Sequence, residues 1–408
     1  MADRPEHRRF LYLLTFCLAL QMLGGSLLFT VYARKIATFG EGVAVFGLSA
    51  TVFSITALIA APQMGKLADR WGRRPVLMIC LSAPVLTRIG LLLAPNEAVF
   101  IGVRALSGAL TAGLIPASLS IVADIVPPEK RGRWIGFVNG GSTVGFALGP
   151  PFGGWLYDQW GLSLPFYATA LASLFALLIP LFLIPETLPK TATRSSPDLT
   201  EPVQETPRVK IADAIPRPYG RFLVLLVLTF SAVVAWRFIE PQFHFYIYDT
   251  LGWTSALFGA CISGYSILST LARIGLGQLS DRFGRKPILM IGLIVHAAQY
   301  VALLTTKSFY WLAVGVAGSG LGEGLFMPAL NALYLDVVSK EYSARILGLR
   351  EAIFSLAGLV GPALAVIAAD SLLPRGIFTI GGSLIILSAL LVPMVISRRN
   401  QPTQEVCS

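Results

Sequence analysis

Long apolar runs alternate with short polar breaks along almost the whole chain. Each run approaches the roughly 20 apolar residues that a helix needs to cross a bilayer, so the pattern predicts membrane-spanning helices. The first six are expected at 10–32, 44–65, 76–95, 98–126, 134–157 and 165–184. Six more are expected at 220–247, 254–279, 288–306, 309–338, 344–369 and 375–396.

One long stretch interrupts this pattern near the middle of the chain. Residues 185–219 hold seven prolines, mixed charges and no apolar run, which indicates a flexible linker. We therefore predict an all-α membrane protein with 12 spans in two six-helix bundles. The bundles occupy 1–184 and 220–396, and a polar tail follows at 397–408.

Composition and charge agree with a membrane protein. The 408 residues are 55% hydrophobic and only 13% charged, with a mean hydropathy of +0.70, whereas soluble domains are about a quarter charged. The net charge of +10 does not require a nucleic-acid partner, because 23 Lys and Arg fall on the side of the N-terminus and four on the other. By the positive-inside rule both termini are expected in the cytoplasm. Short outer loops favour a bacterial inner membrane.

The two halves of the chain repeat each other. The segment GKLADRWGRRPVLM begins at Gly65, and the similar segment GQLSDRFGRKPILM begins 212 residues later. The same offset maps Asp124 onto Asp336 and Gly149 onto Gly361. Parallel repeats of this kind place the substrate path between the halves, near the membrane midplane.

Three segments resemble motifs of the major facilitator superfamily, and the likeness covers essentially the whole chain. The loop GKLADRWGRRP resembles motif A, and FIGVRALSGAL, which contains Arg104, resembles motif B. GFALGPPFGG at 145–154 resembles motif C, which marks the drug:proton antiporter branch. The resemblance implies the major facilitator fold and secondary active transport by alternating access, with no enzymatic activity.

The resemblance also assigns roles to two of these motifs. Motif A acts as a switch whose contacts form and break between inward-open and outward-open states. Its residues here are Gly65, Asp69, Arg70, Gly72, Arg73 and Asp124, with Asp281 and Arg285 in the second copy. In motif C, small residues at four-residue spacing allow close helix packing, and the family interpretation is a helix pair that seals the outer side. Its residues are Gly145, Gly149, Pro150, Gly153 and Gly154. The alternatives are a topogenic basic loop and an ordinary packing face.

Four charged residues inside apolar spans are candidates for proton and substrate coupling. Glu240 and Glu323 are intramembrane carboxyls, which are functional by default, and burial disfavours the charged form of such a group. Arg237 lies one turn before Glu240, so these two could instead form a fixed ion pair. The guanidinium of Arg104 does not deprotonate, so it biases a neighbour's proton affinity or binds an anion.

Other polar and aromatic residues inside the spans are candidates for cargo contacts. They are Gln21, Arg88, Trp236, Tyr265, His296 and Gln299. Gln21 departs from the family pattern, because antiporters of this type often carry an acid there and Gln carries no proton. No metal-ligand spacing or nucleotide-binding loop occurs in a fitting context, so no metal, cofactor or nucleic acid is expected.

Three functional interpretations stay open. The first is proton-coupled export of small amphipathic or drug-like compounds, cations included. The second is a proton symporter that imports a sugar or an organic acid, because motif A fits both. The third is an uncoupled lipid flippase or a transporter-derived sensor. Motif C and the carboxyl-bearing second half favour export. The expected partners are a small-molecule substrate, protons and the bilayer, with the chain as a monomer.

Overall fold

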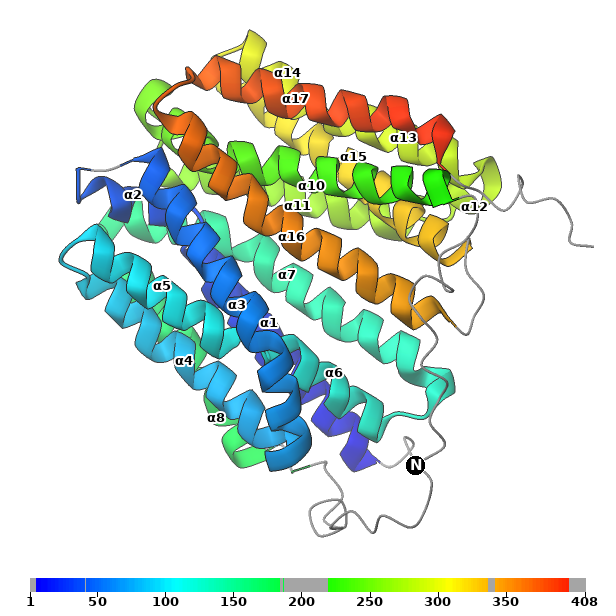
Figure 1. Ribbon diagram of the computed structural model, residues 1–408. Helices are drawn as coiled ribbons and strands as arrows, with labels where there is room; N and C mark the ends of the chain where they lie inside the picture. The colour runs from blue at the N-terminus through cyan, green and yellow to red at the C-terminus, as the bar shows by residue number, and fades with distance from the viewer. Residues whose placement is uncertain (1–4, 41, 184–185, 187–218, 337–341, 396–408) are drawn as a thin grey trace, which may run out of the picture. The chain divides into compact units, whose positions relative to one another are not determined.

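A computed structural model shows a helical chain (Figure 1). It describes residues 5–40, 42–183, 186, 219–336 and 342–395. Nearly all of the predicted linker at 185–219 and the whole predicted tail at 397–408 lie outside these residues. Eleven helices in the described part are long and apolar enough to cross a membrane. The prediction of an all-α membrane protein is therefore confirmed.

The chain forms two compact units. The described residues within 1–198, 241–263 and 365–369 belong to unit 1. Those within 199–240, 264–364 and 370–408 belong to unit 2. Two short segments of the second half of the sequence thus pack with the first half.

The first half of the chain is built from helices joined by short turns. They are α1 (Pro5–Leu27), α2 (Tyr32–Ala37), α3 (Val43–Trp71), α4 (Arg73–Leu93), α5 (Glu97–Thr111), α6 (Leu114–Ile125), α7 (Pro128–Trp160) and α8 (Ser163–Leu183). The turn between α3 and α4 is Gly72 alone, with a φ of 109°. Only glycine adopts this backbone conformation without strain, so motif A requires it.

The second half follows the same plan. Its elements are α10 (Tyr219–Phe245), the π-helical turn η1 (Tyr246–Thr250), α11 (Ser255–Leu276), α12 (Leu279–Phe283), α13 (Arg285–His296), α14 (Ala298–Thr305), α15 (Phe309–Asp336), α16 (Ser343–Ala369), α17 (Pro374–Leu391) and the 3-10 turn η3 (Val392–Met394). Gly284, with a φ of 95°, stands between α12 and α13. It is the repeat of Gly72.

The helix α7 contains the predicted span 134–157 but is not among the eleven apolar helices. It is 33 residues long and so exceeds the length needed for crossing. Eight glycines and several charged residues lower its hydropathy. This helix is therefore long enough to be the twelfth predicted span, but it is less apolar than the other eleven.

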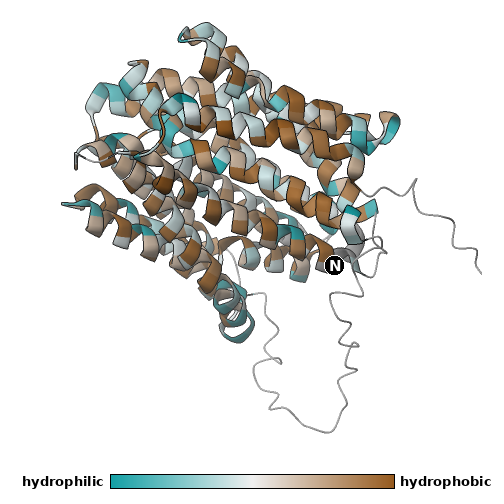
Figure 2. Cartoon of the chain, turned by 45° about the horizontal axis from the view of Figure 1, so that its top comes forward, coloured by the Kyte–Doolittle hydropathy of each residue, from teal (hydrophilic) through white to brown (hydrophobic). Residues whose placement is uncertain are grey.

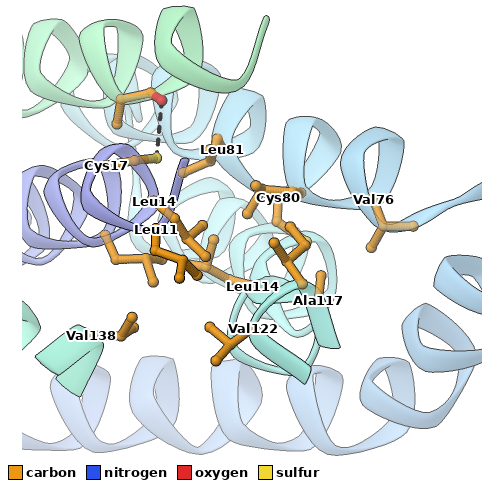
Figure 3. Packing of buried hydrophobic residues seen from close by; sticks show 14 of the residues in the cluster. Leu11, Leu14, Cys17, Val76, Cys80, Leu81, Leu114, Ala117, Val122 and Val138 are labelled. Atoms are coloured by element: carbon orange, nitrogen blue, oxygen red, sulfur yellow. Dashed lines mark hydrogen bonds between the residues drawn. The ribbon is translucent and has the colours of Figure 1, made fainter. Parts of the chain in front are cut away.

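Apolar side chains lie both on the outer surface of the helices and in a buried core in unit 1. Figure 2 shows hydrophobic residues along the lengths of the helices and hydrophilic ones gathered towards helix ends and loops. Large apolar side chains such as Leu86, 72% exposed, face outward, as expected for contact with lipid. In the core, Leu11, Leu14 and Cys17 of α1 pack against α4 and α6 (Figure 3). The Cys17 thiol donates a hydrogen bond to the Ala176 carbonyl at 3.1 Å.

Candidate functional site

Glu323 lies in the middle of α15 and is held by three side chains of α11. Arg273 Nη2 lies 3.0 Å from one carboxylate oxygen of Glu323. The Ser269 hydroxyl donates to the other at 2.6 Å, and the Tyr265 side chain also hydrogen-bonds Glu323. Tyr265, Ser269 and Arg273 follow each other at four-residue spacing, which places them on one face of α11. The carboxylate is thus part of an ion pair between two helices.

The glycine-rich run around Glu323 explains how the two helices come so close. A Cβ at Gly320 would overlap the backbone of Tyr265, and a Cβ at Gly324 would lie 2.5 Å from the Ser269 carbonyl oxygen. Both positions face α11, so the absence of side chains brings α15 against the helix that carries Arg273. The run is therefore a packing surface in unit 2.

A buried histidine of α13, His296, contacts the residue that lies one turn before Glu323 on α15. The Ser319 hydroxyl is 2.8 Å from His296 Nδ1, and Ser319 precedes Glu323 by four residues on α15. His296 also stacks edge-on against Phe326. Gln299 is buried on α14. Two of the candidate cargo contacts therefore lie inside unit 2, and His296 belongs to the polar surroundings of Glu323.

Glu240 makes the local ion pair that the sequence offered as the alternative to a coupling role. Arg237 Nη1 lies 3.0 Å from Glu240 Oε2 within α10. The α10 backbone at Arg237 packs closely against Gly361 of α16, where a Cβ would lie 3.0 Å from the Arg237 carbonyl carbon. Trp236 is half-buried beside this pair.

Motif A forms a charged triad around one arginine in unit 1. Arg73 Nη1 lies 3.2 Å from Asp69, and Arg73 Nε lies 3.3 Å from Asp124. Arg73 also donates to the Ala68 carbonyl at 3.0 Å. Arg70 is exposed. Motif A thus joins the end of α3, the start of α4 and the end of α6.

Unit 2 contains the same triad 212 residues later. Arg285 forms ion pairs with Asp281 and Asp336, the second with an Nε to Oδ2 distance of 3.1 Å. Arg285 also donates to the Ser280 hydroxyl at 2.9 Å. Arg285 is thus the cationic partner of Asp336. The two halves of the chain therefore repeat these side-chain contacts as well as the sequence.

Two further contacts fasten motif A to α8. The Glu186 carboxylate accepts hydrogen bonds from the backbone N–H groups of Arg73 and Arg74, at 3.0 and 3.2 Å. In return, the Arg74 guanidinium donates to the carbonyls of Pro180 and Leu181. A carboxylate at a helix N-terminus and a cation at a C-terminus both stabilise the helix dipole. Sequence reasoning did not find Glu186, which stood at the start of a segment predicted to be a linker.

The glycines of motif C pack α7 against α1. A Cβ at Gly149 would lie 2.8 Å from the Leu27 amide nitrogen, and a Cβ at Gly153 would lie 2.8 Å from the Leu27 Cα. Gly145 packs in the same way against Ala19, and Gly154 against Ser255 at the start of α11. The stripe is thus an interface between two helices.

The end of α7 also caps the start of α11, whose first residues belong to unit 1. The two carboxylate oxygens of Asp158 accept hydrogen bonds from the backbone N–H groups of Ser255 and Ala256, at 3.0 and 2.7 Å. Nearby, Arg34 donates to the Trp253 carbonyl at 3.1 Å and lies 3.7 Å from the centre of the Tyr248 ring. Sequence reasoning did not assign Asp158 this contact.

Two arginines of unit 1 meet at a tyrosine. Arg88 of α4 donates a hydrogen bond to the Tyr32 hydroxyl. Arg104 of α5 lies over the Tyr32 ring at 5.1 Å and over the Phe53 ring at 4.5 Å. The candidate cargo contact Gln21 is buried on α1. A polar cluster therefore lies among apolar spans of unit 1.

The described residues form eleven helices that are long and apolar enough to cross a membrane, together with a duplicated charged triad and charged groups inside the spans. These features define a multi-pass membrane transporter. The chain belongs to the Major Facilitator Superfamily, because the family model matches residues 14–236 and 225–406. The resemblance inferred from the motifs is confirmed, and the protein is a transporter rather than an enzyme.

Comparison with known proteins adds relatives of stated function. The chain is 30% identical to multidrug resistance protein MdtG of Klebsiella pneumoniae over 339 residues, which cover 81% of this chain and 79% of that protein. It is 28% identical to the class B tetracycline resistance protein of Escherichia coli over 321 residues, 78% of this chain and 77% of that one. The crystal structure of a D-xylose-proton symporter superposes with a TM-score of 0.74 over 96% of this chain and 99% of that chain, at 17% identity. This last likeness shows the fold alone.

Proposed function

We propose that this transporter exports small amphipathic, drug-like compounds in exchange for protons by alternating access. The observation that carries the proposal is the ion pair between Glu323 and Arg273. Protonation of Glu323 removes its negative charge and ends the pair, so the α11–α15 contact differs between the two protonation states. A proton taken up on one side of the membrane is thereby linked to helix packing.

Glu240 has a smaller part in the proposed cycle. Its partner Arg237 lies on the same helix, so protonation of Glu240 changes a local contact rather than one between helices. We assign Glu323 as the main proton carrier, with Glu240 and Arg237 as a second charged pair. Arg104 supplies a fixed positive charge that biases the proton affinity of its surroundings.

The motif A triads suit contacts that form and break in each cycle. The Asp69 side chain is 72% exposed, and an exposed ion pair contributes at most about 1 kcal/mol. The Arg73–Asp69 pair, and the Arg285–Asp281 pair whose carboxylate is 60% exposed, are therefore weak enough to rearrange. We propose that these loops lie on the cytoplasmic side, with both termini, in a bacterial inner membrane. The chain is proposed to act as a monomer.

The direction of transport is proposed from the relatives, whose names describe multidrug resistance and tetracycline resistance. The packed stripe between α7 and α1 supports it, since this is the segment that resembles the antiporter motif. The test must distinguish export from two alternatives, import of sugars or organic acids and uncoupled transport.

The test uses inverted membrane vesicles that are acidic inside and contain a pH-sensitive dye. A panel of lipophilic drugs is added, and recovery of dye fluorescence reports protons leaving in exchange for cargo. We expect recovery with the wild type, with Asp370→Asn as an exposed carboxylate control, and loss of recovery with Glu323→Gln. Recovery that persists in Glu323→Gln would contradict the assigned proton carrier.

A second arm separates the alternatives. Right-side-out vesicles receive sugars and organic acids, and uptake is measured with and without a proton gradient. Gradient-driven uptake of one of these compounds, without recovery in the drug panel, would replace export by import. Transport that does not depend on the gradient would favour the uncoupled interpretation.

A further inference from the structure

Arg88 is a buried cation whose ion-pair partner is missing from the described part of the chain. It is 9% exposed and lies five residues before the end of α4. Its Nη1 donates to the Tyr32 hydroxyl oxygen, while its Nε has no hydrogen-bond partner. Its Nη2 lies beside Gly25 of α1, where an added Cβ would be 3.5 Å away. Among described residues, no carboxylate lies within 4.0 Å of this guanidinium.

A buried guanidinium in this situation calls for a negative group. Removing a charge from water costs several kcal/mol unless a partner of opposite charge or hydrogen bonds replace the water. One tyrosine hydroxyl satisfies one of the five N–H donors of an arginine. The edge formed by Nε and Nη2 is the fork that binds both oxygens of a carboxylate or phosphonate.

Further polar groups among the described residues lie around Arg88. The Tyr32 hydroxyl accepts from Arg88, so its own O–H proton is available to a negative group. Gln21 lies one turn before Gly25 on α1, and its Oε1 is buried without a partner. The Ser173 hydroxyl beside Gly24 likewise has no partner. Both groups thus lie on or beside the stretch of α1 that also contacts the Arg88 side chain.

The two intramembrane acids are each matched by an arginine of their own unit. Glu323 pairs with Arg273 and Glu240 pairs with Arg237. A cationic cargo would therefore compete with an existing partner for either carboxylate. An anionic cargo would instead meet Arg88, whose charge the described residues leave uncompensated.

We propose that the cargo is an amphipathic organic anion, whose carboxylate or similar acidic group binds to Arg88 and the Tyr32 hydroxyl. This proposal rests on the proposed transport function and names its substrate class. Arg104 contacts the Tyr32 ring through a cation–π interaction and adds to the positive potential. The apolar body of the cargo lies against neighbouring aromatic rings such as Phe53.

The test compares two dyes that share a xanthene core and differ in charge, carboxyfluorescein as anion and rhodamine 123 as cation. Their dissociation constants are measured by fluorescence polarisation on the purified full-length protein at one pH. We expect carboxyfluorescein to bind at least about tenfold more tightly than rhodamine 123, a factor that corresponds to about 1.4 kcal/mol. Tighter binding of rhodamine 123 would overturn the proposal.

Variants locate the anion on Arg88. Arg88→Gln should weaken carboxyfluorescein binding at least about tenfold without weakening rhodamine 123 binding, and Arg88→Lys should fall between. Arg375→Gln, which removes an exposed positive charge, is the matched control. Equal weakening of both dyes by Arg88→Gln would mean a merely structural role. If that variant does not fold, Tyr32→Phe, which keeps the ring, should still weaken the anion selectively, and unchanged binding would contradict the proposal.

Binding and proton exchange are read separately, so the two proposals can fail independently. Selective anion binding without dye recovery in acidic vesicles would contradict proton-coupled export and leave the anion site in place. Dye recovery driven by rhodamine 123 but not by carboxyfluorescein would leave proton-coupled export in place and refute the anion site.

Discussion

The contact between α1 and α7 predicts a sharp difference between glycines of one helix. At Gly153 a Cβ would lie 2.6 Å from the Leu27 carbonyl carbon and 2.8 Å from its Cα. At Gly140 it would meet nothing within 4 Å. Both are interior positions of α7, so alanine gains about 1 kcal/mol of helix propensity over glycine at each. Only the packing differs between Gly153→Ala and Gly140→Ala.

The magnitude follows from the atoms that must move. Carbon atoms pack at about 3.5–4.0 Å, so the helices must separate by about 1 Å, and the obstacle is backbone that cannot rotate away. Overpacking of this kind costs about 1–3 kcal/mol. We therefore expect Gly153→Ala to be less stable than the wild type, and Gly140→Ala to be equal to it or slightly more stable.

Thermal unfolding of the detergent-solubilised protein measures this difference. A change of 1 kcal/mol shifts Tm by about 2–4 °C in domains of 150–250 residues, so Gly153→Ala should melt a few degrees below Gly140→Ala. Gly149→Ala should behave like Gly153→Ala, because its Cβ would also meet backbone atoms of α1. Equal melting temperatures for all three variants would refute the close packing of α1 and α7.

Other contacts give predictions of the same kind. Arg73→Gln and Arg285→Gln each remove both ion pairs of a triad, and each should slow proton-coupled transport in vesicles; a loss of rate in only one of them would show that the two copies differ in role. Asp158→Asn should destabilise the protein by about 1 kcal/mol, since it removes a charged cap from the N-terminus of α11, and an unchanged Tm would contradict that cap. Glu186→Gln should act in the same way on α4, and faster hydrogen exchange at its first amides would report it.

Most of the fold was predictable from the sequence because hydropathy and repeats act over long stretches. The runs of apolar residues predicted the helices, and the offset of 212 brought Asp124 and Asp336 into corresponding triads. The helix α7 was predicted as a span from its apolar run, although its composition is less apolar than that of the others.

The partners of individual charges were less predictable. Arg273 pairs with Glu323 on another helix. A single sequence does not show which faces of α11 and α15 meet, so this pair could not be derived. The local pair of Arg237 and Glu240 was foreseen, because three-residue spacing on one helix is visible in the sequence. Glu186 was missed because the prolines and mixed charges of 185–219 characterise the segment as a whole. They do not show that its second residue contacts the start of α4.

The glycine content of α7 has a consequence for how the protein is made. Insertion of a helix from the translocation channel depends on the free energy that its side chains gain in lipid, and eight glycines supply little of it. Its stripe gains stability only when α1 is already beside it, since small residues act through packing. The α1 helix must therefore be in place before α7 is stable in the bilayer. A substitution in α1 at Leu27 would then reduce the insertion of α7 during synthesis.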